Sequence, residues 1–123
     1  MTHNEDKSQL SSIRIKSAVK MAVLIRALRN AFLMSQSYLA ELSSTSRPTI
    51  NRLETMDKRS VRSETVDDVL QVFRDRGAEI TVSDEEVTIR FTRSALLYAL
   101  KELEMSAVER DKHHAETERI NSK

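Results

Sequence analysis

The stretch from residue 47 to residue 52 combines two guanidinium groups, a hydroxyl and a carboxamide. Arg47 and Arg52 can each donate two hydrogen bonds, the arrangement that reads guanine O6 and N7 in a major groove. Asn51 can bind adenine or a phosphate, and Thr49 can contact a base through its hydroxyl or methyl group. Pro48 has no donor, but it can press on a thymine methyl. These five residues are therefore the predicted base-reading edge.

Two short helices joined by a tight turn must carry this edge. Leu39, Ala40 and Leu42 give the first segment an apolar side, and Ile50 and Leu53 do the same for the second, so that the two sides can close on each other. We predict a helix-turn-helix over residues 35 to 54.

Serines mark the start of each of these helices. Ser35 and Ser46 are predicted N-caps, since a serine oxygen can accept a hydrogen bond from an amide of the first turn. Pro48 falls in the first turn of the second helix, where its missing amide does little harm.

The segment from about Ile25 to Val72 resembles the Cro and phage-repressor (XRE) type of helix-turn-helix transcriptional regulator. The resemblance rests on matched positions at family spacing, namely Ser35, Gln36, Leu39, Ala40, Ser46, Ile50, Leu53 and Glu54. It implies an ion pair between Arg29 and Glu54. The chain departs from the pattern at Ser44 and Leu33, where the family favours glycine, and a positive φ at Ser44 would cost about 1 kcal/mol.

The resemblance also implies phosphate contacts at the starts of the two helices. Ser35, Gln36 and Ser46 are the predicted phosphate ligands there, because helix N-termini attract anions. The loop after the second helix adds Lys58, Arg59 and Arg62, whose contribution to DNA affinity would be sensitive to salt. The competing interpretation of these loop charges is solubility alone.

The charge is unevenly distributed along the chain. Residues 11 to 62 hold ten Lys or Arg against three acids, whereas residues 77 to 123 hold seven against ten. A basic head and an acidic tail suit a protein that lays one end on phosphates.

Composition excludes several classes of protein. The chain has no Cys, which rules out disulfides and cysteine-based zinc sites, and 123 residues leave little room for a large catalytic cleft. No nucleophile with its base and no glycine-rich phosphate loop is visible, so we expect neither an enzyme nor a cofactor.

The run from Met21 to Leu28 is too short to span a membrane, and we expect a cytoplasmic protein. His113 and His114 are adjacent and cannot form the i, i+4 pair of a helical metal site.

The predicted fold is mainly α, with four divisions. Residues 1–16 are expected to form a flexible arm, 17–76 a four- to five-helix lambda-repressor-like DNA-binding domain, 77–112 a β-hairpin plus helix for dimerisation, and 113–123 a flexible tail. The first helix should run from Ser17 to Leu33. Its expected core stripe comprises Val19, Val23, Leu24, Ala27, Leu28, Ala31 and Phe32.

Beyond Gly77, the one glycine, apolar residues alternate as in a hairpin and then repeat as in a helix. A helix is expected from Arg93 to at least Arg110, with leucines at coiled-coil spacing. Packing of this helix within the monomer is the alternative to dimerisation. The predicted dimerisation residues are Ile80, Val82, Val87, Ile89, Phe91, Leu96, Leu100 and Leu103.

Two classes of function fit these patterns. The first is a homodimeric repressor or autorepressor that binds an inverted-repeat operator through helix 46–54. The second is an antitoxin-type protein, whose C-terminal region binds a toxin or other protein partner while its head regulates its own operon. Exposed leucines in the C-terminal helix would indicate a missing partner.

Overall fold

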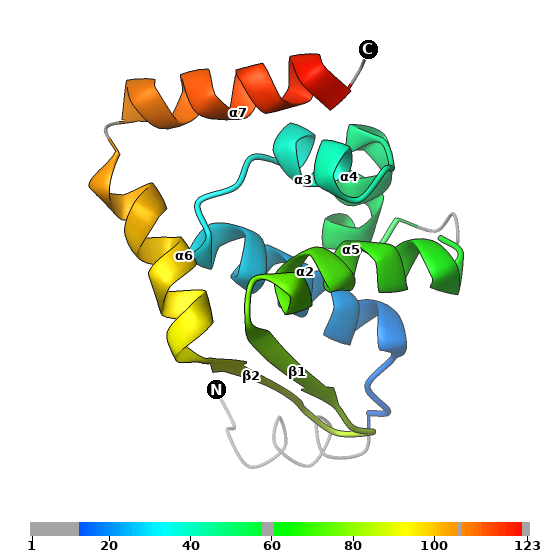
Figure 1. Cartoon of the computed structure of the whole chain (residues 1–123). Helices are drawn as coiled ribbons and strands as arrows, with labels where there is room; N and C mark the ends of the chain where they lie inside the picture. The colour runs from blue at the N-terminus through cyan, green and yellow to red at the C-terminus, as the bar shows by residue number, and fades with distance from the viewer. Residues whose placement is uncertain (1–12, 58–60, 106, 122–123) are drawn as a thin grey trace, which may run out of the picture.

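Four helices form a head, and a hairpin followed by two more helices wraps one side of it (Figure 1). The computed structural model describes residues 13–57, 61–105 and 107–121, so Lys58, Arg59 and most of the predicted arm lie outside the described residues. The helices are α2 (Ser17–Ala31), α3 (Gln36–Leu42), α4 (Arg47–Thr55), α5 (Ser63–Asp75), α6 (Arg93–Glu104) and α7 (Ala107–Asn121), and the strands are β1 (Ala78–Val82) and β2 (Val87–Phe91). This arrangement confirms the predicted fold class.

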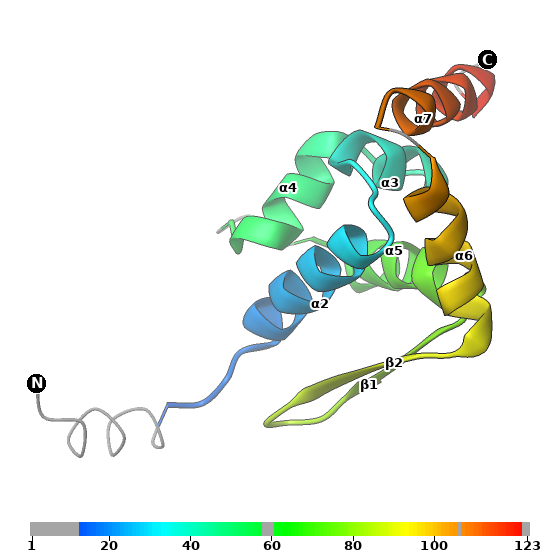
Figure 2. The same ribbon diagram turned by 90° about the vertical axis from the view of Figure 1, so that its left-hand side faces the viewer.

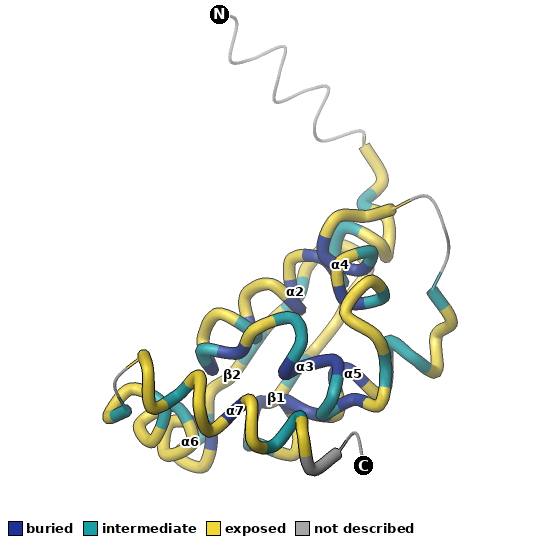
Figure 3. Tube along the Cα trace, turned by 90° about the horizontal axis from the view of Figure 1, so that it is seen from above, coloured by how far each residue is buried: buried dark blue, intermediate teal, exposed yellow. Residues whose placement is uncertain are grey.

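The core lies where α2, α3, α4 and α5 meet. Leu28, Phe32, Ile50 and Phe73 are at most 1% exposed, and the rings of Phe32 and Phe73 stack with centroids 5.9 Å apart. Figure 3 shows that the buried residues concentrate in the head, whereas α6 is mostly exposed. The head therefore has a core of its own to support α3 and α4.

The buried side of α2 differs from the predicted one, because Ala22 and Ile25 are buried although the sequence did not predict them in the core stripe. Leu24, Leu28 and Phe32 are buried as expected, but Val23 is 54% exposed, and Ala27 and Ala31 are exposed as well. A helix packed on one side buries only a stripe, so apolar residues outside that stripe face solvent.

Among the described residues, three other than glycine adopt the left-handed conformation, each at the end of a helix. Leu33 follows α2 with φ 54°, Ser44 follows α3 with φ 56°, and Met56 ends α4 with φ 57°. Ser44, which stands where the family favours glycine, thus has the positive φ that was considered from the sequence. Each turn is held by a backbone hydrogen bond, such as Thr45 N–H to Ala40 C=O at 2.9 Å. The chain accepts local strain to keep these turns short.

Gly77 ends α5 and lets α6 approach closely. Its φ is +91°, and a Cβ built there would lie 2.7 Å from the backbone nitrogen of Ala95 and 2.8 Å from Thr92 Oγ1. Thr92 Oγ1 donates a 2.6 Å hydrogen bond to the carbonyl of Gly77. Any side chain at position 77 would push α6 away from the head.

The hairpin packs on the head through one of its two faces. β1 and β2 are antiparallel, and Ile80 pairs with Ile89 on the face that contacts the core. The far end is tied down by Lys20 of α2, whose Nζ donates to the carbonyl of Ser83 at 2.8 Å. Figure 2 shows the hairpin extending beneath α2. A lone hairpin is marginal in water, and the head supplies the packing it needs.

The predicted single helix from Arg93 to at least Arg110 is wrong. α6 ends at Glu104, Met105 is extended with ψ 144°, and α7 begins at Ala107. The guanidinium of Arg110 explains how the break is tolerated, because it donates to the carbonyls of Glu102 and Met105. Those carbonyls would otherwise lack partners at a helix C-terminus.

Helix α7 also corrects the predicted flexible tail. Residues 113 to 121 are helical, and His114, expected to lie in that tail, is only 5% exposed. The helix lies across the top of the head in Figure 1, where it contacts α3.

Replacing Ser44 by Gly should raise the free energy of unfolding by about 0.5 to 1 kcal/mol, because glycine adopts φ 56° without the steric cost of a Cβ. Urea denaturation monitored by circular dichroism measures this change.

The adjacent Ser43 is the matched control. It has φ −97°, and its buried hydroxyl donates to the carbonyls of Leu39 and Ala40. Ser43→Gly should therefore destabilise the protein. Equal effects at the two serines would contradict the strain argument.

Candidate nucleic-acid interface

Helices α3 and α4 close on each other as the sequence predicted. Leu39 and Ile50 are fully buried between them, Ala40 is 4% exposed, and Leu53 is 8% exposed. A small residue at position 40 allows the two backbones to approach closely. The pair rests on α2 and α5, which fix its orientation in the head.

Both predicted serine caps are present. Ser35 Oγ accepts a hydrogen bond from the Tyr38 amide at 3.0 Å, and Ser46 Oγ accepts one from the Thr49 amide at 3.2 Å. Pro48 occupies the first turn of α4, as expected. Both helix starts are therefore well formed.

The five residues of the predicted base-reading edge lie on α4 and are exposed to different degrees. Arg47, Pro48 and Asn51 are exposed, whereas Thr49 and Arg52 are half-buried. Ser46 Oγ and Thr49 Oγ1 are 2.7 Å apart, and the Arg52 guanidinium donates to Thr49 Oγ1 at 3.1 Å. A chain of hydrogen bonds thus organises one side of this edge.

Arg52 folds back along α4. Its Nε is buried and has no hydrogen-bond partner among the described residues, and its side chain borders an open cavity of about 420 Å³ between α2, α4 and α5. A buried donor without a partner is costly. Turning the guanidinium outward toward a ligand would relieve that cost.

The predicted ion pair between Arg29 and Glu54 is present and forms two contacts. Arg29 Nε donates to Glu54 Oε2 at 2.6 Å and Arg29 Nη2 donates to Glu54 Oε1 at 2.8 Å, with the Glu54 side chain 5% exposed. A third donation, from Nη1 to the carbonyl of Met34, ties the turn after α2 to the same group. The hydrogen bond and charge of Glu54 raise the pKa of Arg29.

Gln36 lies at the contact between the two helices. Its Nε2 is 3.5 Å from Asn51 Oδ1 and 3.4 Å from Glu54 Oε1, near the limit for hydrogen bonds. This places a predicted phosphate ligand beside the base-reading edge.

The predicted basic residues after α4 lie apart from the base-reading edge, where the structure describes them. Arg62 is exposed at the start of α5, and Lys58 and Arg59 lie outside the described residues.

Of the predicted dimerisation residues, Ile80 and Ile89 pack within the protomer, whereas Val82 is 42% and Phe91 is 39% exposed. Leu96, Leu100 and Leu103, which we call the leucine seam, are 59%, 46% and 65% exposed. Packing of this seam within the protomer, the alternative considered from the sequence, is not what the structure shows.

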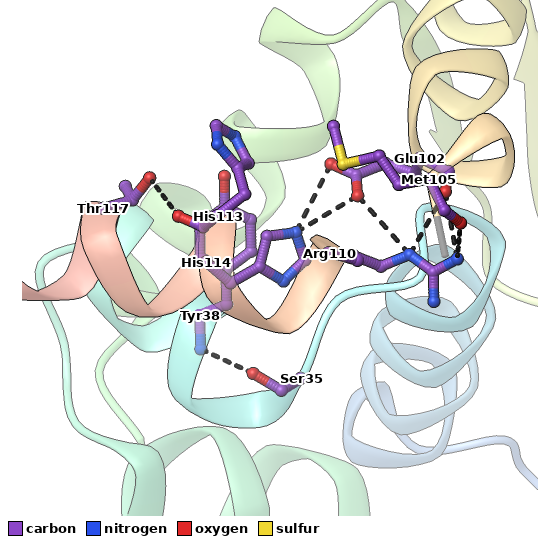
Figure 4. Close-up of polar contacts among 8 residues, drawn as sticks. All are labelled: Ser35, Tyr38, Glu102, Met105, Arg110, His113, His114 and Thr117. Carbon is purple, nitrogen blue, oxygen red and sulfur yellow. Dashed lines mark hydrogen bonds and ion pairs between the residues drawn. The ribbon is translucent and has the colours of Figure 1, made fainter. Parts of the chain in front are cut away.

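The sequence analysis missed a cluster that joins α7 to α3. The rings of His114 and Tyr38 stack with centroids 3.7 Å apart and an interplanar angle of 3°, and Glu102 and Arg110 complete the group (Figure 4). No local pattern in the sequence indicates this cluster, because it depends on the break between α6 and α7 and on the return of α7 to α3.

A helix pair of this geometry, with capped starts and an exposed polar edge, defines a helix-turn-helix. Residues 25–74 match the helix-turn-helix family model. The matched segment is similar to the helix-turn-helix domains of the Cro/C1 type, the XRE family of DNA-binding transcriptional regulators. Comparison with curated proteins and with solved structures gave no match.

The described part of the chain shows neither a metal-binding cluster nor a membrane-spanning helix. No group of three or more His, Cys, Asp or Glu side chains there is placed to hold a metal ion. None of its helices is both long and apolar enough to cross a membrane.

Replacing Arg29 by Met should destabilise the protein by about 3 kcal/mol, because Glu54 would remain buried without its partner. Adding Glu54→Leu should recover part of that loss, which gives a coupling energy of about 1 to 3 kcal/mol in a double-mutant cycle. Urea denaturation of the four proteins measures it.

The exposed pair of Arg90 and Glu79 on the hairpin provides the control. These side chains are 69% and 58% exposed, so Arg90→Met should change stability by less than about 1 kcal/mol. Additive effects of Arg29→Met and Glu54→Leu would show that the buried pair is not coupled.

Proposed function

We propose that the protein is a sequence-specific transcriptional repressor or autorepressor that binds an inverted-repeat operator as a homodimer. The observation that carries this proposal is the exposed polar edge of α4, supported from behind by the ion pair of Arg29 and Glu54. A helix so fixed can enter a major groove without reorganising.

Sequence reading is assigned to the base-reading edge. Arg47 and Arg52 bind guanines through two hydrogen bonds each, which is worth about 1 to 3 kcal/mol of discrimination per base pair. Arg52 turns out of its half-buried position to do so, and its unpartnered Nε favours that movement. Pro48, Thr49 and Asn51 add contacts to neighbouring bases.

Register on the duplex is assigned to phosphate contacts. Ser35, Gln36 and Ser46 lie at the N-termini of α3 and α4, where the unpaired amides and the helix dipole attract phosphate oxygens. Arg62, together with Lys58 and Arg59 outside the described residues, adds affinity that does not depend on sequence.

Dimerisation is assigned to the leucine seam, together with exposed apolar residues at the two ends of the hairpin. Three exposed leucines in coiled-coil register on one helix form an apolar stripe that a second copy can cover. Val82 and Phe91 extend the apolar surface, whereas Ile80 and Ile89 are largely used in packing on the head. Two heads joined in this way would contact half-sites about one helical turn apart.

The second candidate is an antitoxin-type protein. The same exposed seam supports it, because a stripe that no described residue covers fits a different protein as well as a second copy. In that case the leucines bind a toxin and the head regulates the operon.

Selection from a pool of random duplexes, followed by sequencing, should enrich a palindromic motif with the wild-type protein. The double variant Arg47→Ala, Arg52→Ala should lose the motif, because both guanidinium forks are gone, and keep weak, salt-sensitive binding. The control is Arg90→Ala, an exposed arginine on the hairpin, which should retain the motif. Failure of the wild type to enrich any motif would contradict sequence-specific reading.

Sedimentation velocity should show a dimer for the wild type and a monomer for Leu100→Glu, because a buried carboxylate would disrupt an apolar seam. Val108→Glu on α7 is the control, since Val108 is 78% exposed and lies outside the seam. A monomeric wild type would reject the homodimer and favour a heterologous partner.

A further inference from the structure

Helix α7 is held to the head by a small group of polar side chains. His114 Nε2 lies 3.2 Å from Glu102 Oε2, and the ring of His114 stacks on Tyr38 of α3. Arg110 binds the carbonyls of Glu102 and Met105 and lies 3.7 Å from the Glu102 carboxylate. We call Tyr38, Glu102, Arg110 and His114 the polar knot (Figure 4).

The rest of α7 contributes little apolar burial. His114 is the one buried residue of α7 among its described side chains, and Val108 is 78% exposed. Hydrogen bonds in the knot exchange with bonds to water, so each gives only a small net gain. Since apolar burial is the dominant source of docking energy, a helix docked in this way is easily released.

The joint between α6 and α7 permits such a release. Met105 has φ −79° and ψ 144°, which ends α6 in an extended conformation. The sequence from Glu104 to Ala107 contains neither Gly nor Pro, the residues that usually force a helix to stop. The bend is thus maintained by the contacts of α7, chiefly the polar knot, rather than by the local sequence.

The docked helix lies next to the part of α3 that the proposed function assigns to phosphates. Tyr38, on which His114 stacks, is in the first turn of α3, and its amide is capped by Ser35. Figure 4 shows α7 crossing this turn. Residues 107 to 121 carry four carboxylates against three Lys or Arg, a net charge of −1 with His neutral, so α7 would oppose DNA chiefly by covering this turn.

We propose that α7 is an autoinhibitory strap that the polar knot holds across the first turn of α3, where it weakens DNA binding until it is released. This inference rests on the proposed function, because it concerns access to the phosphate contacts of that site. Coupling between strap and DNA is reciprocal: DNA binding displaces α7 as much as displacement of α7 favours DNA.

The absence of native cysteine makes this movement measurable in the full chain. Spin labels on Gln71→Cys of α5 and Glu116→Cys of α7, both exposed positions, report the distance between strap and head by pulsed electron paramagnetic resonance. Fluorescence anisotropy with a short duplex of arbitrary sequence at low ionic strength reports DNA affinity.

His114→Ala removes the imidazole at the centre of the knot, and Glu102→Gln replaces the carboxylate that faces it by a neutral amide, which weakens its contacts with His114 and Arg110. Both should replace a single narrow distance by longer, broader ones and should tighten DNA binding about fivefold or more. The control is His113→Ala, which removes a neighbouring imidazole that is exposed and should change neither readout. If His114→Ala does not fold, Glu102→Gln, which alters a single atom of the side chain, still provides the test.

Three other results would each contradict one part of the proposal. Unchanged distances in both knot variants would show that the knot does not hold α7. Longer distances with unchanged affinity would show that the strap does not inhibit. Absence of DNA binding by every protein, wild type included, would overturn the proposed function itself and the strap with it.

Discussion

The buried ion pair of Arg29 and Glu54 is the interaction on which the head of this protein depends. It joins the last turn of α2 to the last turn of α4, and the third donation of Arg29, to Met34, also fixes the turn that leads into α3. Because two nearly parallel hydrogen bonds define the orientation of both groups, the pair sets the angle at which α4 leaves the core. Burial of the two charges costs desolvation free energy, which each partner offsets for the other. Loss of either partner would therefore leave an uncompensated buried charge.

The positive φ angles show how this geometry is kept compact. Leu33 and Ser44 flank α3 on its two sides, in conformations that glycine adopts more easily. Relief of this strain would stabilise the chain, yet longer turns would move α3 away from α2 and α4. Backbone hydrogen bonds across each turn and burial of Leu39 and Ile50 offset the strain. The interface is thus a rigid element with small local costs.

The C-terminal half of the chain is attached to the head by different kinds of contact. The hairpin is anchored to the head by apolar contacts and by Gly77, whereas α6 exposes its leucines and α7 is docked through polar groups. One part of the chain is fixed by burial of apolar side chains, and the other leaves apolar side chains exposed. In the proposed function, this division separates the reading of DNA from its regulation, since the seam assembles two heads while the strap controls access to them.

The sequence by itself determined the elements whose physics is local. The pairing of Arg29 with Glu54 was implied by the family resemblance, whereas serine caps at Ser35 and Ser46 and the alternating pattern of the hairpin could be read from residue types and spacing. The base-reading edge was placed on α4 in the same way, although the spacing did not show that Arg52 folds back. Only the tertiary structure decided which apolar residues of α2 are buried, that the helix after the hairpin breaks at Met105, and that α7 returns to α3. Those outcomes depend on contacts between distant segments, and a local pattern carries no information about which surface will lie opposite it.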